Sequence, residues 1–81
     1  MVIPLNHISS GIKAQVVWIA SEDSMASRLS DLGFIPGEII SCVLPGRKNG
    51  MRAYLVRNTV IALRNSTAME IFVKPLSQED S

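Results

Sequence analysis

The stretch RLSDLGFIPG at residues 28–37 is the most informative part of this 81-residue chain, because it predicts where a helix ends. Met25, Leu29 and Leu32 recur at helical spacing and form one apolar stripe. Gly33 follows directly, and glycine commonly ends a helix because it adopts the left-handed backbone conformation without steric cost. We therefore expect a short helix that stops at Gly33.

Both ends of this helix carry further signals. Ser21 and the two acids after it suit a helix start, where free N–H groups and the helix dipole favour oxygen acceptors and negative charge. Phe34 lies one residue beyond the glycine and can fold back onto Leu29, a contact that often accompanies this type of helix end. Pro36 and Gly37 then turn the chain. The sequence predicts that the chain re-enters a strand after this turn.

Short apolar segments surround the helix. We expect strands at residues 12–19, 39–44, 51–57, 60–63 and 71–73, with a loop at 45–50. In the first of them, Val17 and Ile19 break the alternation of apolar and polar residues. Either both faces of the strand are buried there, or a β-bulge shifts the phase.

Two local patterns describe the second half of the chain. Residues 57–59 read Arg-Asn-Thr and predict a tight hairpin turn, because Asn tolerates positive φ better than most residues. Residues 65–68 can form a single helical turn with Asn65 as its cap, and Pro75 stops the last strand. The chain is therefore expected to be mainly β, a closed or nearly closed small barrel of about five strands. One short helix follows the first strand, and a one-turn helix precedes the last.

The length and composition are those of one small domain. Apolar residues make up 47% of the chain, which is enough for one core. We assign the domain to residues 1–76 and expect residues 77–81 to be a frayed polar tail. The chain has one cysteine, Cys42, so it forms no internal disulfide, and no apolar run approaches the length of a membrane span. The N-terminus has no basic residue ahead of an apolar stretch, so we expect a cytoplasmic protein.

The charges are unevenly distributed although the net charge is only +1. Residues 39–69 contain no Asp or Glu, and the acidic residues lie on either side of this segment. The basic residues of the segment are Arg47, Lys48, Arg52, Arg57 and Arg64. They are either solvated strand faces and a loop tip, or a docking surface for an acidic partner or an anionic membrane.

No residue pattern predicts catalysis or a metal site. The sequence has neither a Gly-x-Ser-x-Gly elbow nor a phosphate-binding glycine loop with its lysine. Iron and zinc sites need several convergent His, Cys or carboxylate ligands, whereas His7 and Cys42 have no such neighbours in sequence. We expect Cys42 to be a small core residue and His7 to be exposed near the N-terminus.

Two blocks of the sequence resemble the FeoA family of ferrous iron transport accessory proteins. The first is the stretch at residues 28–37, and the second is IALR at residues 61–64, followed after three residues by Ala68. The spacing of Leu5, Ile8, Gly11 and Ala14 also fits, so that the resemblance covers roughly residues 5–74. The sequence departs from the family at Asn58, where members often have Gly, and at Thr67, where members often have an acid.

The resemblance implies an SH3-like barrel without a cofactor, which acts in the cytoplasm beside FeoB, the membrane-bound, GTP-binding ferrous iron permease. The role would be to stabilise or regulate the transporter by protein–protein contact, not to carry iron. The candidate contact residues are Arg28, Leu32, Phe34, Ile35, Arg47, Lys48, Arg52, Arg57 and Arg64.

Other interpretations of the same residues stay open. Arg28 can instead form a surface pair with Asp31 or Asp23, and Arg64 can tie the strand end to the short helix or to Glu70. Leu32, Phe34 and Ile35 can belong to the core. Two further hypotheses are a nucleic-acid-binding barrel that uses the basic segment 47–64, and weak self-association through exposed strand edges. The near-neutral net charge argues against nucleic acid as a partner.

Overall fold

A computed structural model of the chain describes residues 1–44 and 50–76. Its elements, in chain order, are β1 (Ile3–Pro4), the 3-10 helix η1 (Leu5–His7), β2 (Lys13–Ile19), α1 (Asp23–Leu32), β3 (Ile39–Leu44), β4 (Met51–Val56), β5 (Thr59–Arg64), α2 (Asn65–Ala68) and β6 (Ile71–Pro75). Residues 45–49 of the expected loop, which include Arg47 and Lys48, and the expected tail at 77–81 lie outside the described residues.

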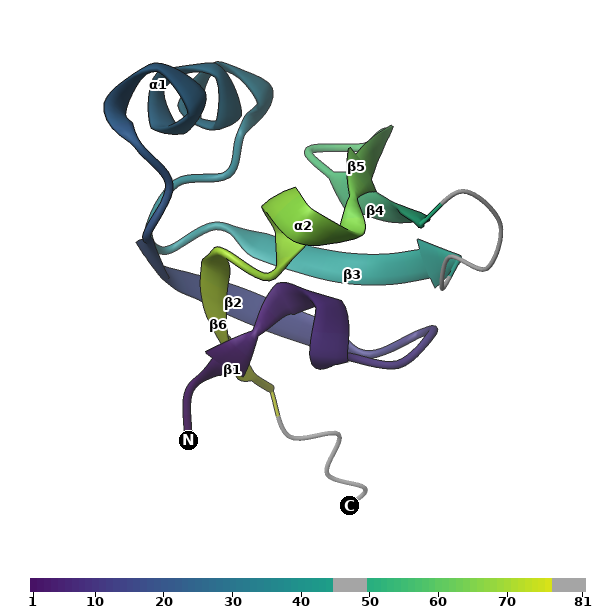
Figure 1. The fold of residues 1–81 in the computed structure, drawn as a ribbon. Coiled ribbons are helices and arrows are strands. Elements are labelled where there is room, and N and C mark those ends of the chain that lie inside the picture. Colours follow the sequence, from purple (N-terminus) through teal and green to yellow (C-terminus); the bar gives the residue numbers. More distant parts are fainter. Residues whose placement is uncertain (45–49, 77–81) are drawn as a thin grey trace.

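The described strands form one antiparallel sheet of six strands in the order β1-β6-β2-β3-β4-β5 (Figure 1). The expectation of a mainly β fold with two helices at these places is confirmed. The sixth strand is β1, whose two residues are too few to give a periodic signal in the sequence. The last strand also runs on to Pro75, because a proline tolerates a strand position that needs no N–H donor.

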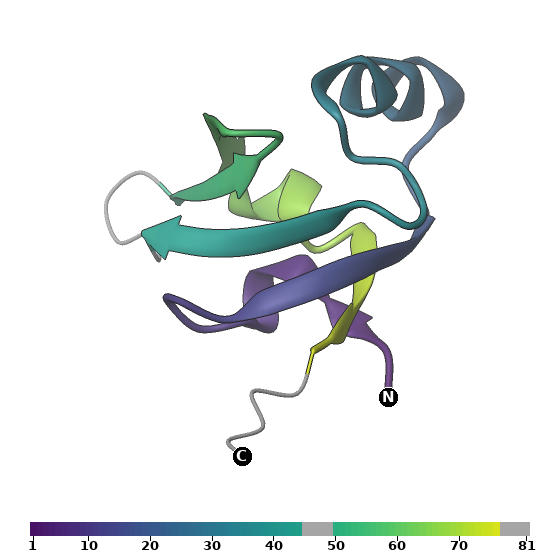
Figure 2. The same cartoon turned by 180° about the vertical axis from the view of Figure 1, so that it is seen from behind.

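Helical segments fill the space between the two ends of the sheet. The side chain of Asn6, in η1, donates from Nδ2 to Oδ1 of Asn65, in α2, over 3.1 Å. The hydroxyl of Tyr54 donates to the carbonyl of Leu5 over 3.4 Å. Figures 1 and 2 show α2 and η1 beside the strands, whereas α1 projects from one end of the sheet. The barrel is thus completed by η1 and α2 at its open side.

The end of α1 is built as the sequence predicts. Gly33 has a φ of 108°, its N–H donates to Ser30 O over 3.0 Å, and Phe34 N–H donates to Leu29 O over 2.9 Å. These two bonds satisfy carbonyls that the last helical turn leaves free. Phe34 and Leu29 are both buried in the core. The helix start differs, because Glu22 occupies the cap position and Ser21 Oγ donates to Glu70 Oε1 instead.

A β-bulge resolves the irregular alternation in the first long strand. The register of β2 against β6 shifts between Val16 and Trp18. Val16 is buried, whereas Val17 and Trp18 are exposed, and the indole of Trp18 stacks on Phe72 with ring centroids 5.3 Å apart. The bulge therefore turns Trp18 outward, where a strict alternation would have placed it inside.

The hairpin between β4 and β5 turns at Arg57 and Asn58. Their φ angles are 51° and 65°, so both residues adopt the left-handed conformation that two-residue hairpin turns require. Val56 and Thr59 pair directly across the turn. The expected tight turn is confirmed, and Asn58 takes the position without needing glycine.

The core is mostly aliphatic, with Phe34 and Tyr54 as its aromatic members, and no charged residue is buried among the described positions. Its members are Leu5, Ile8, Ala14, Val16, Leu29, Phe34, Ile40, Cys42, Tyr54, Val56, Leu63, Ala68, Ile71 and Val73. Cys42 is buried and His7 is exposed, as expected. Asn65 does not cap its own helix, since its Oδ1 accepts hydrogen bonds from Asn6 and from Arg52 Nε.

Candidate docking surface

The outward face of β3, β4 and β5 carries a band of exposed apolar side chains. Ile40, Cys42 and Tyr54 are buried, so the intervening residues of these strands face solvent. Strand pairing sets Leu55 beside Val60 and also beside Ser41. The exposed apolar residues of this outer face are Ile39, Val43, Leu55 and Val60, which are 38–57% exposed.

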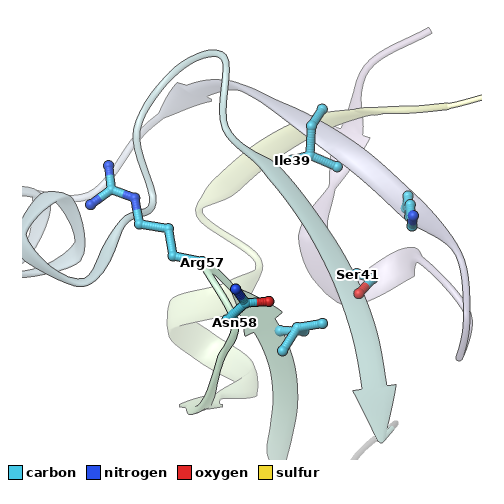
Figure 3. Close-up of a pocket in the computed structure, with 6 residues that line it drawn as sticks. Ile39, Ser41, Arg57 and Asn58 are labelled. Atoms are coloured by element: carbon cyan, nitrogen blue, oxygen red, sulfur yellow. The ribbon is translucent and has the colours of Figure 1, made fainter.

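A shallow hollow of about 250 Å³ lies within this outer face. We call it the groove; it is lined by Lys13, Ile39, Ser41, Leu55, Arg57 and Asn58. Figure 3 shows Ile39 and Ser41 on β3, across the groove from Arg57 and Asn58 at the β4–β5 turn. Three separate strands and one turn therefore supply its walls, with two aliphatic side chains between polar ones.

The charge of the groove is positive and partly compensated. Lys13 projects from β2 and is exposed. Arg57 Nε donates to Glu38 Oε1 over 3.3 Å, and the two side chains are 52% and 25% exposed. An exposed pair of this kind contributes under about 1 kcal/mol, so Arg57 can exchange partners at low cost.

The predicted basic residues do not form one surface. Arg52 lies on the inner side of β4 and donates from Nε to Asn65 Oδ1 over 3.0 Å. Arg64 is exposed and pairs with Met51 on the outward side, and Arg28 is exposed on α1. Neither makes an ion pair within residues 1–44 and 50–76, so the alternative pairings with Asp31, Asp23 or Glu70 are not formed there.

The predicted apolar contact residues divide between core and surface. Phe34 is fully buried, Ile35 is half-buried and Leu32 is 43% exposed. Leu32 ends the helix stripe on the solvent side, because only Met25 and Leu29 reach the core. Gly33 beside it packs against the β4–β5 turn, since a Cβ at that glycine would lie 3.3 Å from Arg57 Cδ.

Sequence reasoning missed Lys13, Ile39, Leu55 and Asn58 as surface residues that lie together. One signal was available: residues 39–44 are apolar at nearly every position. In a barrel strand only alternate residues reach the core, so such a run places aliphatic side chains on the outside.

We also searched the described residues outside the groove for a metal site, a membrane-spanning helix and a perturbed titratable group. Residues 1–44 and 50–76 contain no group of three or more His, Cys, Asp or Glu that could hold a metal ion. None of the helices described is long and apolar enough to span a bilayer. Burial raises the pKa of Tyr54 to about 12, with Cys42 adding to the rise and Arg52 opposing it.

The sequence and the fold of this chain are both similar to those of FeoA proteins. The FeoA domain family matches residues 3–75. A crystal structure of an iron uptake regulatory protein, FeoA, is 26% identical with a TM-score of 0.84, covering 94% of this chain and all of that one. A FeoA-like protein from Clostridium acetobutylicum is also 26% identical, with a TM-score of 0.80 and coverage of 99% and 93%.

A third structure adds a description of the fold. FeoA from Stenotrophomonas maltophilia, complexed with zinc, is 30% identical with a TM-score of 0.77 and covers 89% of each chain. That protein is described as a procaryotic SH3 domain protein with a suggested role as a ferrous iron transport activating factor. No curated protein sequence matched this chain. The six-stranded fold is thus SH3-like, and because the family match spans almost all of its residues, the chain belongs to the FeoA family.

Proposed function

We propose that this protein is a non-catalytic accessory protein of ferrous iron uptake, which acts in the cytoplasm by binding FeoB, the GTP-binding membrane permease. The observation that carries the proposal is the match of the FeoA domain to residues 3–75. The role suggested for the Stenotrophomonas maltophilia protein, activation of ferrous iron transport, supports it. The protein would stabilise or regulate the transporter through surface contacts.

The outer face supports a binding role on physical grounds. Contiguous exposed apolar side chains rimmed by polar ones mark interaction sites on small proteins. Here Leu55 and Val60 lie side by side across two strands, with Ile39 on the next strand and Arg57 at the rim. Leu32 and Arg28 on α1 remain further candidate contacts for the permease.

Nucleic acid is the weaker alternative for the segment 47–64. Arg52 and Arg64 lie on opposite faces of the sheet, so they do not form one basic track. Single-stranded nucleic acid is bound through a continuous basic track with exposed aromatic rings between the cations. The aromatic residue of this segment, Tyr54, is fully buried and so cannot stack on a base.

Co-purification tests the proposal. The tagged full chain is incubated with detergent-solubilised permease without nucleotide, with GDP and with a non-hydrolysable GTP analogue. We expect the permease to be retained in at least one of these states, and retention to fall at high salt. Absence of association in all three states would refute the proposed function.

A further inference from the structure

We propose that the groove binds an extended acidic peptide segment, with one apolar side chain seated between Ile39 and Leu55 and a neighbouring carboxylate held by Arg57 and Lys13. The inference rests on the proposed function only for the identity of the protein that supplies the segment. The binding chemistry follows from the six lining residues alone.

The size of the groove favours a peptide anchor. Ligand pockets for cofactors and drug-sized molecules usually occupy about 300–1,000 Å³ and enclose most of the ligand. The groove has about 250 Å³, and Figure 3 shows Ile39 and Ser41 of β3 facing the β4–β5 turn across it. A hollow of this size accommodates one or two side chains of a chain that continues past it on both sides.

The lining residues fit an acidic partner. Lys13 and Arg57 are cationic, Ser41 and Asn58 offer neutral hydrogen-bonding groups, and the described residues that line the groove include no acid. A planar guanidinium binds a carboxylate through two parallel hydrogen bonds, which adds geometric specificity. Ile39 and Leu55 remove an apolar side chain from water beside these charges.

In the absence of a partner, the side chain of Arg57 forms an ion pair with Glu38. In Figure 3 the guanidinium of Arg57 points away from Ser41 and Ile39, and its Nε bonds to Glu38 Oε1 over 3.3 Å. A peptide carboxylate in the groove must therefore draw Arg57 away from Glu38. This competition predicts that removing the charge of Glu38 strengthens peptide binding, which is a gain that loss of folding cannot imitate.

An anionic membrane fits the groove less well. Recognition of anionic lipid uses clusters of about 4–8 basic residues that face the bilayer together. The groove supplies two cations in a concave setting with aliphatic side chains between them. Concavity and an apolar centre are features of peptide sites.

The test is a titration of the isotope-labelled full chain, followed by NMR. The probe is a capped peptide with a central leucine and two glutamates on each side. One control peptide has glycine in place of the leucine, and another has lysines in place of the glutamates. We expect saturable shifts at the groove residues with the probe and far weaker ones with both controls. Shifts centred elsewhere, or none, would overturn the inference.

Three variants sharpen the test. Glu38→Gln should tighten binding of the probe about two- to fivefold, the loss of one exposed ion pair. Leu55→Asp should weaken it by about tenfold or more, because a carboxylate then stands where the apolar side chain sits. Val17→Asp is the matched control: Val17 is 43% exposed and Leu55 38%, both on strands, and Val17 lies outside the groove. Equal effects of the two aspartate variants, or unchanged binding by Glu38→Gln, would contradict the proposal.

Two further outcomes separate the alternatives. If vesicles of phosphatidylserine and phosphatidylcholine bind the chain, and Leu55→Asp abolishes vesicle binding without affecting the peptide, the groove is a lipid site and the inference is wrong. If the probe binds as expected while the permease does not associate with the chain, the proposed function fails and the groove chemistry stands. If the permease associates but the probe does not bind, the inference fails alone.

Discussion

Replacing Gly33 by alanine tests whether the end of α1 is packed as closely as the structure shows. Gly33 has a φ of 108°, and a Cβ at this position would lie 2.8 Å from Val56 Cγ1 and 3.3 Å from Arg57 Cδ. Val56 is fully buried, so it has little room to retreat. The substitution is therefore destabilising for two separate reasons: the left-handed backbone conformation, and the steric contact with the β4–β5 hairpin.

The free-energy cost of each effect can be estimated separately. An L residue in a left-handed conformation costs about 1–2 kcal/mol. The Cβ contact is roughly 1 Å shorter than a comfortable carbon–carbon distance. Forcing an extra methyl group into packed surroundings costs about 1–3 kcal/mol. We expect Gly33→Ala to lower the free energy of unfolding by about 2–5 kcal/mol, a large part of what a domain of this length possesses.

Gly37 supplies the matched control. Its φ is 97°, and a Cβ there would meet nothing within 4 Å, so Gly37→Ala should pay the conformational cost alone. Urea denaturation followed by circular dichroism gives the free energy of unfolding of both variants and the native chain. If Gly33→Ala costs no more than Gly37→Ala, the close approach between Gly33 and the hairpin is wrong.

Three further predictions concern the core, a buried titratable group and the groove. Leu29→Ala should lower the free energy of unfolding by about 2–5 kcal/mol, and Leu32→Ala by less than about 1 kcal/mol, because only the first is buried; equal losses in urea denaturation would contradict this assignment. Burial raises the pKa of Tyr54 from 10 to about 12, so the folded state holds this proton more tightly than the unfolded chain does. The free energy of unfolding should therefore decrease as the pH rises from about 10 to about 12. The slope from this group is at most about 1.4 kcal/mol per pH unit, and Tyr54→Phe should remove it; an unchanged slope would refute the assignment. Arg57→Glu should weaken association with the permease, and more so at low salt than at high salt. Lys74→Glu makes the same charge change outside the groove and should leave the association unchanged. Equal losses of affinity for the two variants, measured by interferometry, would show that only the net charge of the protein determines the association.

The parts of the fold that the sequence predicts are those fixed by a short run of residues. The helix end at Gly33 and the hairpin turn at Asn58 both need a left-handed backbone, and few residue types accept it. The hydrogen bonds and strand pairing that form these two turns involve residues close by in the chain, although Gly33 also packs against the β4–β5 turn. The sequence also predicts the one-turn helix at residues 65–68, although Asn65 does not cap it, and the observed strand ends lie within two residues of the expected ones.

The parts that escaped prediction depend on residues far apart in the chain. The two residues of β1 become a strand only by pairing with Phe72 and Val73 of β6. Ser21 lost its cap role to a hydrogen bond with Glu70, 49 residues away. Asn65 likewise accepts from Asn6 and Arg52. A polar side chain takes whichever partner the tertiary structure brings near, and local spacing does not reveal that choice.

The groove escaped prediction for a related reason. Lys13 and Ser41 are cross-strand partners, as are Ser41 and Leu55, so three segments of the sequence meet on one face. The lack of acidic residues in the segment 39–69 suggests that its arginines form one basic surface, but Arg52 and Arg64 lie on opposite faces of the sheet. Strand register, and not charge density along the chain, determines which of them can act together.

Ferrous iron uptake in cells that lack this protein but retain the permease shows whether the outer face is needed for transport. Cells receive the native chain, Leu55→Asp or Val17→Asp at equal expression, and the initial rate of radiolabelled Fe²⁺ uptake is measured. We expect the native chain and Val17→Asp to restore uptake, whereas folded Leu55→Asp does not. Full restoration by Leu55→Asp, or uptake that never depends on the protein, would contradict a role of the outer face in ferrous iron uptake.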